Sequence, residues 1–211
     1  MKSYLLCGAL LTAFLVGLCT AAPEPAMVQR AGQWTLDVRC ERLQQLVLPW
    51  GPGGEQRFWY TIITVTNRTG MDADFYPKCD LMTDTFQVLP AGKGVPPVVF
   101  DMIRQRHASQ YPLLESLQRV PNRILEGEDN ARDIAVIWKD FDPQATSLRL
   151  FIGGLSNETA VVSHPVAVDA DGNPVPIYLR KTLEMDYTLR GDPALRSSVE
   201  VVYKGQSWVM R

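Results

Sequence analysis

The sequence predicts a mainly β protein, an antiparallel β-sandwich with a short helical insertion. Short segments rich in β-branched and aromatic residues recur along the chain, separated by turns of Gly, Pro, Asn and Asp. Several segments alternate apolar and polar residues, so one face meets a core and the other meets water. About eight or nine such strands at this spacing are typical of two packed sheets. A jelly roll or a partly closed barrel is the alternative.

The N-terminus has the pattern of a secretory signal peptide over residues 1–21. Lys2 precedes an apolar stretch, Leu5–Leu18, that is too short to span a bilayer comfortably, and small residues follow it. We expect cleavage after Ala21, a flexible Pro/Ala-rich leader over 22–32, and a secreted or periplasmic protein. Lipid attachment at Cys19 is the minority alternative, because the preceding leucine is atypical of lipoprotein signals.

Residues 33–211 are expected to form a single domain, because about 190 residues suit one core. Trp34–Cys40 alternates as a half-buried strand, and Leu43–Leu48 extends it or begins the next one. Phe58–Asn67 is the densest β signal of the chain, almost wholly aromatic and β-branched. A further strand region over Asp74–Leu89 ends at a Pro-Ala-Gly turn.

The middle of the chain departs from this pattern. Residues 96–119 predict a helical insertion that crosses from one sheet to the other, since two prolines open a stretch with near-helical apolar spacing. Pro112–Leu117 is expected to form a second short helical piece. The chain then re-enters the sandwich through two buried strands, Ile134–Phe141 and Leu148–Ile152, the pair around which the other strands are added.

Two hairpins are predicted at the C-terminal end. Val161–Val168 and Val175–Leu189 flank Asp169–Pro174, whose Asp, Gly, Asn and Pro residues are strong turn formers. The second strand of this hairpin alternates clearly. Val199–Lys204 and Ser207–Met210 form the last hairpin.

The segment Phe58–Leu155 resembles the immunoglobulin-like (telokin-like) modules of secreted bacterial proteins, a family of unknown function. The resemblance rests on Val65-Thr66-Asn67-Arg68-Thr69-Gly70, on Leu125-Glu126-Gly127-Glu128, and on Val136-Ile137-Trp138 with the later Leu148-Arg149-Leu150. It implies an immunoglobulin-like sandwich and a scaffold of binding or structural type. It implies no chemistry.

No catalytic, cofactor or metal site is predicted. The histidines are His107 and His164, no Ser lies in a Gly-x-Ser-x-Gly turn, and no paired His or Cys spacing suits zinc. Asp169-Ala170-Asp171-Gly172-Asn173 begins like a calcium loop, but Pro174 and Arg180 stand where that loop needs Gly and an acid. A hairpin turn explains these residues without a metal ion.

Three residues are singled out as structural or binding candidates. Cys40 and Cys79 remain after removal of the signal peptide and are candidates for one disulfide in an oxidising compartment. The alternative is two separate buried thiols. Trp50, inside a Gly/Pro-rich loop, is the candidate for an exposed ligand or interaction surface.

The predicted function is an exported, non-catalytic β-sandwich protein with a binding or structural role at the cell envelope or outside the cell. Without Lys2 the 21 basic and 23 acidic residues leave a net charge of −3, which gives no field for nucleic acid. The expected partner is a protein or a glycan at the envelope, with no transmembrane anchor. The alternative is a secreted hydrolase that acts on glycans through paired carboxylates such as Asp140 and Asp142.

Overall fold

The computed structural model describes residues 25–49 and 54–211, without the side chains of residues 193, 194 and 196. The predicted signal peptide, Cys19 and Trp50 lie outside these residues. The elements, in chain order, are β1 (Ala26–Val28), β2 (Asp37–Cys40), β3 (Gln44–Pro49), β4 (Glu55–Asn67), β5 (Ala73–Asp74), β6 (Lys78–Thr83), β7 (Val88–Pro90), α1 (Pro97–Arg106), β8 (Glu115–Ser116), β9 (Arg123–Ile124), β10 (Gly127–Lys139), β11 (Ser147–Gly153), β12 (Thr159–Val168), β13 (Pro174–Arg190), a 3-10 segment (Pro193–Ser198) and β14 (Glu200–Met210).

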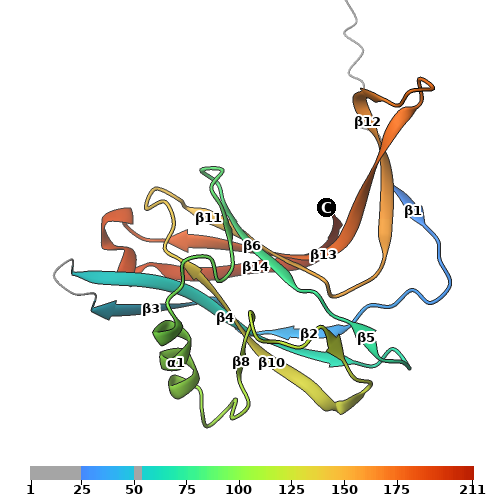
Figure 1. Cartoon of the computed structure of the whole chain (residues 1–211). Helices are drawn as coiled ribbons and strands as arrows, with labels where there is room; N and C mark the ends of the chain where they lie inside the picture. Colours follow the sequence, from blue (N-terminus) through green and yellow to red (C-terminus); the bar gives the residue numbers. More distant parts are fainter. Residues whose placement is uncertain (1–24, 50–53) are drawn as a thin grey trace, which may run out of the picture.

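The strands form two main sheets that pack face to face, which confirms the predicted β-sandwich (Figure 1). The seven-stranded sheet has the order β1-β12-β13-β11-β6-β7, and β14 also pairs with β13. The five-stranded sheet has the order β2-β4-β10-β8, and β3 also pairs with β4. Their pairings are antiparallel except for the short parallel contact between β8 and β10. A small sheet of β5 and β9 completes the fold.

The main core lies between the two sheets. Trp59, Ile63 and Val65 of β4 enter it from the five-stranded sheet, and Leu183 and Met185 of β13 enter it from the seven-stranded sheet. The residues that alternate with them face outward. The alternation predicted for Val175–Leu189 is therefore confirmed, because strand geometry sends successive side chains to opposite faces.

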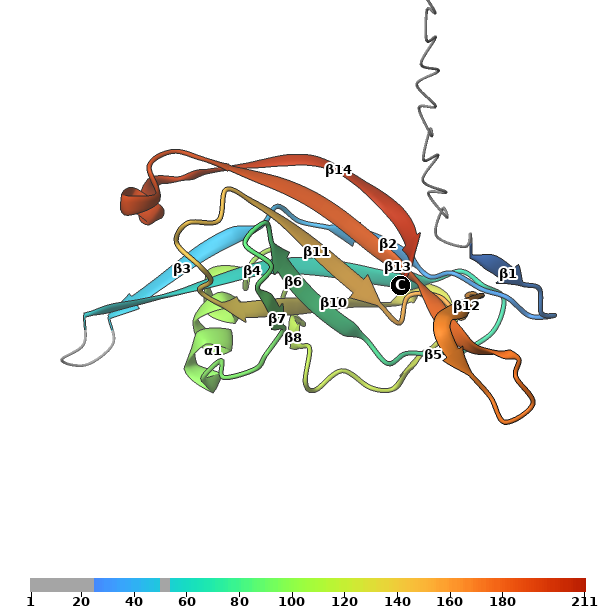
Figure 2. The same ribbon diagram turned by 90° about the horizontal axis from the view of Figure 1, so that it is seen from above.

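A second core covers the outer face of the five-stranded sheet. Phe58, Tyr60 and Ile62 of β4 pack there with Val99 and Ile103 of α1. Both faces of β4 are thus buried along Phe58–Val65, which explains why this stretch is almost wholly aromatic and β-branched and does not alternate with charged residues. The chain forms three layers, with α1 outermost (Figure 1). Figure 2 looks down onto these layers.

The insertion at 96–119 leads from β7 of the seven-stranded sheet to β8 of the five-stranded sheet, as predicted. The prediction of a second helical piece at Pro112–Leu117 was wrong. Glu115 and Ser116 instead pair with Ile134 and Ala135 of β10, so tertiary hydrogen bonds hold this backbone extended. Within the described residues, no helix is long and apolar enough to cross a membrane.

The two strands expected to form a central pair belong to different sheets. β10 pairs with β4 and β8, whereas β11 pairs with β13 and β6. Residues 140–146 cross between the sheets. Trp138 of β10 and Leu148 of β11 still meet in the main core. The prediction of two buried strands is confirmed, and they contribute to one core from different sheets.

The β12–β13 hairpin extends beyond the body of the sandwich as an arm, with β1 paired along it (Figures 1 and 2). Its predicted turn is stabilised by Asp169, whose carboxylate accepts the backbone N–H groups of Asp171 and Asn173 at 3.0 and 2.8 Å. Val166, Val168 and Tyr178 of the arm are exposed. The part of the arm near its turn therefore adds surface to the protein without adding core.

Candidate functional site

Two sheet edges lie side by side along one flank of the sandwich. β2 and β3 together form an edge of the five-stranded sheet, and the residues between them shift the pairing with β4 by one position. β14 forms the matching edge of the seven-stranded sheet. It is one strand with a bulge opposite Asp186 and Tyr187, so the prediction of a hairpin between Val199–Lys204 and Ser207–Met210 was wrong. Such irregularities keep two edges from pairing directly. A cleft opens between them.

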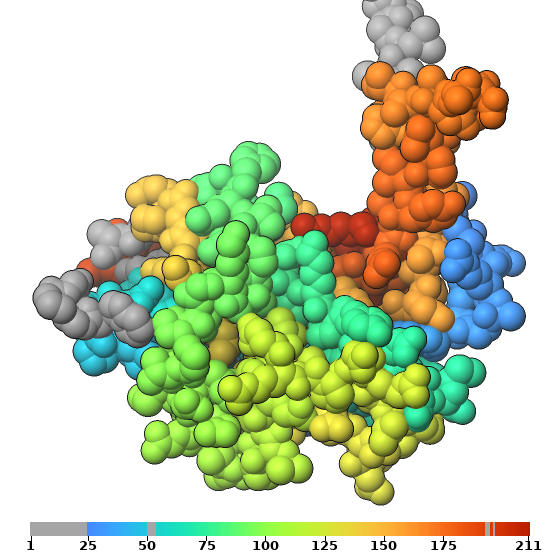
Figure 3. Space-filling model, viewed as in Figure 1, coloured from blue at the N-terminus to red at the C-terminus, as the bar shows by residue number. Residues whose placement is uncertain are grey.

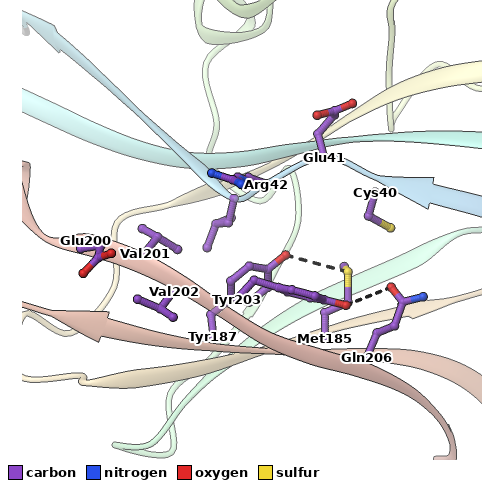
Figure 4. A pocket seen from close by; sticks show the side chains of 11 residues that line it. Cys40, Glu41, Arg42, Met185, Tyr187, Glu200, Val201, Val202, Tyr203 and Gln206 are labelled. Atoms are coloured by element: carbon purple, nitrogen blue, oxygen red, sulfur yellow. Dashed lines mark hydrogen bonds between the residues drawn. The ribbon is translucent and has the colours of Figure 1, made fainter.

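The cleft has a volume of about 470 Å³ (Figure 4). Leu43, Met185 and Tyr187 of the main core line it, and Cys40 and Val201 pack against that core. The remaining lining residues are Glu41, Arg42, Glu200, Val202, Tyr203 and Gln206. The cleft thus leads from solvent to the interior of the sandwich, and its volume is in the range of ligand sites.

Two tyrosines form the aromatic part of the cleft. Their rings, on Tyr187 of β13 and Tyr203 of β14, have centroids 5.5 Å apart and planes tilted by 59°. Tyr187 is buried, and its hydroxyl contacts the Met185 sulfur at 3.9 Å. Tyr203 is 47% exposed and donates a hydrogen bond to Gln206 Oε1 at 3.3 Å. Polar groups therefore lie at the mouth of the cleft and apolar groups at its floor.

Burial disfavours ionisation of three lining groups, the Cys40 thiol and the hydroxyls of Tyr187 and Tyr203. It raises the pKa of the Cys40 thiol to about 12, and the negative charge of Glu41 adds to the shift. Burial also raises the pKa of Tyr187 and of Tyr203. A nucleophilic cysteine needs the opposite shift, because the thiolate is the reactive form. The surroundings of Cys40 therefore do not activate its thiol as a nucleophile.

The acids of the cleft do not form a catalytic pair. The Glu41 carboxylate accepts the Tyr111 hydroxyl at 2.5 Å, on the helix-covered side of the five-stranded sheet. Figure 4 shows its side chain directed away from Met185 and Tyr187. Glu200, the other acidic lining residue, is exposed on β14.

Asp140 and Asp142 do not line this cleft. The Asp140 carboxylate accepts Trp59 Nε1 at 2.7 Å and Arg57 at 3.1 Å. Asp142 Oδ1 accepts the backbone N–H of Gln144 at 2.9 Å. Both acids stabilise the crossing between the sheets, which accounts for them without a glycan substrate.

Cys40 and Cys79 come from facing sheets and pack in or against the same core. Each is a free thiol in the structure. Burial raises the pKa of Cys79 as well, with smaller contributions from Asp80 and Cys40. The predicted aromatic strand residues Phe58, Trp59 and Tyr60 are fully buried and supply core instead of a ligand platform.

The histidines have structural partners. His107 Nε2 lies 3.0 Å from the Tyr60 hydroxyl, and His164 Nδ1 accepts the backbone N–H of Ala167 at 2.8 Å. Across residues 25–49 and 54–211, no group of three or more His, Cys, Asp or Glu could hold a metal ion.

The sequence alone did not indicate this cleft. The alternation of β13 predicts that Met185 and Tyr187 face a core. That they also line an open cleft depends on β2, β3 and the residues between them, which are distant from β13 in sequence. No family model matches the chain, and neither the curated proteins nor the solved structures give a match.

Proposed function

We propose that this is an exported, non-catalytic binding protein of the cell envelope or the extracellular space, and that the cleft between its sheet edges is the binding site. The observation that supports this is an open cleft of about 470 Å³ whose floor is formed by Leu43, Met185 and Tyr187 of the main core. The signal-peptide pattern of the sequence supports export.

The ligand class follows from the lining. Met185, Tyr187 and Val201 offer apolar surface, and transfer of a charged group onto such a floor would be unfavourable. Gln206 and the Tyr203 hydroxyl offer hydrogen bonds at the mouth. The part of the ligand that reaches the floor is therefore uncharged and apolar, and its polar end is directed to the mouth of the cleft.

The experiment uses N-phenylnaphthylamine, an uncharged dye that fluoresces in apolar surroundings. Titration of the mature protein should give saturable fluorescence. Val201→Trp fills the cleft and should raise the Kd of the dye at least tenfold. Val166→Trp is the matched control, because Val166 is 82% exposed on the arm, and it should leave the Kd unchanged.

A second measurement locates the dye. Bound dye should slow alkylation of Cys40 at alkaline pH, since Cys40 lines the cleft. The proposal is contradicted if the dye shows no saturable binding. It is also contradicted if the dye binds equally to both tryptophan variants and does not protect Cys40 from alkylation. Urea unfolding of each variant shows whether Val201→Trp has damaged the fold instead of the site.

A further inference from the structure

We propose a second binding site, for an acidic saccharide, on the outer face of the seven-stranded sheet. Two adjoining hollows, of about 370 and 330 Å³, share Tyr76, Gly154 and Arg180 as lining residues. We call them together the outer groove. It lies at the base of the arm, where Figure 3 shows the C-terminal residues at the bottom of a depression between the arm and the β6–β7 hairpin.

The outer groove is separate from the cleft. Along β13, Met185 and Tyr187 point to the interior, whereas Arg180 and Thr182 line the groove on the opposite face. The two sites can therefore be occupied and tested independently of each other.

Cationic side chains line the groove. Its three acids have nearby cations: Glu158 lies 2.6 Å from Lys181, Asp74 lies 3.7 Å from Arg123, and Asp80 lies 3.6 Å from Arg211. Within the part of the chain that the structure describes, Arg180 and Arg30 have no ion pair. A guanidinium in a concave site is well suited to bind a carboxylate through paired hydrogen bonds.

The neighbouring groups suit a sugar ring. Tyr76 is 65% exposed and offers an aromatic face beside Arg180. The Asp80 side chain is 9% exposed, and its cations lie at 3.6 and 3.8 Å. Among the described residues no hydrogen bond reaches it, so its oxygens can accept sugar hydroxyls. The cations, the buried acceptor Asp80 and the exposed aromatic ring of Tyr76 together fit a sugar that carries a carboxylate.

The shape of the groove depends on a close backbone contact. Gly154 has φ +87°, and a Cβ there would lie 2.5 Å from the backbone oxygen of Tyr76. The backbone at Tyr76 thus packs directly against Gly154, at the start of the connection between β11 and β12. The groove is therefore formed by fixed backbone and not by surface side chains alone.

The test compares oligogalacturonate with its fully methyl-esterified form, which removes only the charge. Oligogalacturonate should bind, with a Kd that rises with salt, and the ester should bind at least tenfold more weakly. Arg180→Gln should weaken binding at least tenfold, whereas Arg190→Gln, the same change at an exposed residue of β13, should not. Tyr76→Ala should also weaken binding, with Tyr178→Ala as its control.

Equal binding of acid and ester, equal effects of the paired variants, or equally tight binding of a glutamate oligomer would overturn the proposal. Unchanged urea midpoints of Arg180→Gln and Tyr76→Ala establish that the site, and not the fold, is altered. Val201→Trp should leave this binding intact, so failure of the cleft proposal and failure of this one give different results.

Discussion

The indole N–H groups of Trp59 and Trp138 offer a sharp test of the packing described above. The two residues are register partners on β4 and β10, face the same core and are fully buried. Trp59 Nε1 donates to Asp140 at 2.7 Å, whereas Trp138 Nε1 is buried without a hydrogen-bond partner among the described residues. Replacement of each by Phe removes the same atoms from two different settings.

The magnitudes follow from that difference. The loss of apolar contact on going from indole to phenyl is similar at the two positions and largely cancels in the comparison. Trp59→Phe also removes a hydrogen bond to a carboxylate, worth about 1.5–3 kcal/mol, although Arg57 still binds Asp140. Trp138→Phe removes an unpaired buried donor, which relieves about 1 kcal/mol or more. Trp59→Phe should therefore be the more destabilising change by about 2.5–4 kcal/mol.

Urea unfolding followed by circular dichroism measures this difference, provided that the m-values of the variants agree. Trp138→Ala, which leaves a cavity, should cost about 3–5 kcal/mol and confirms that the position belongs to the core. The reasoning is refuted if Trp138→Phe is as destabilising as Trp59→Phe. That result would mean that the Trp138 N–H has a partner in solution, such as a buried water molecule.

Three further outcomes are expected. Hydrogen bonds from Lys181 hold the pKa of Glu158 below its usual value of 4.5, so its contribution to stability is present above that pH and is lost as the pH falls through the lower, folded value. Unfolding midpoints measured against pH should show this loss, and Glu158→Gln should reduce it. Burial raises the pKa of Cys40 from 9.0 to about 12, so alkylation by iodoacetamide at neutral pH should be on the order of 1000-fold slower in the folded protein than in urea; similar rates would show that the thiol is exposed. Gly154→Ala should cost at least about 1–2 kcal/mol from its positive φ, and more from the clash with the Tyr76 carbonyl, so an unchanged urea midpoint would contradict the described contact.

Local pattern was sufficient to predict much of the fold. The alternation of Leu183, Met185 and Tyr187 predicts a strand with one buried face, because side chains of a strand alternate whatever its neighbours are. The Asp-, Gly- and Asn-rich turn before Pro174 also predicts a hairpin from local pattern, because the hydrogen bonds of such a turn are made within a few residues. The crossing of the insertion from one sheet to the other also agrees with the sequence-based expectation.

Pairing between distant strands was decided by the tertiary structure alone. β10 and β11 are neighbours in sequence and lie in different sheets, and Glu115–Ser116 is extended because β10 supplies its hydrogen bonds. Asp140 is structural because Trp59 and Arg57 reach it from a strand far away in sequence. The cleft and the outer groove both arise where such distant segments meet. A sequence determines which face of a strand is apolar, but the edge that this strand meets depends on the packing of the whole chain.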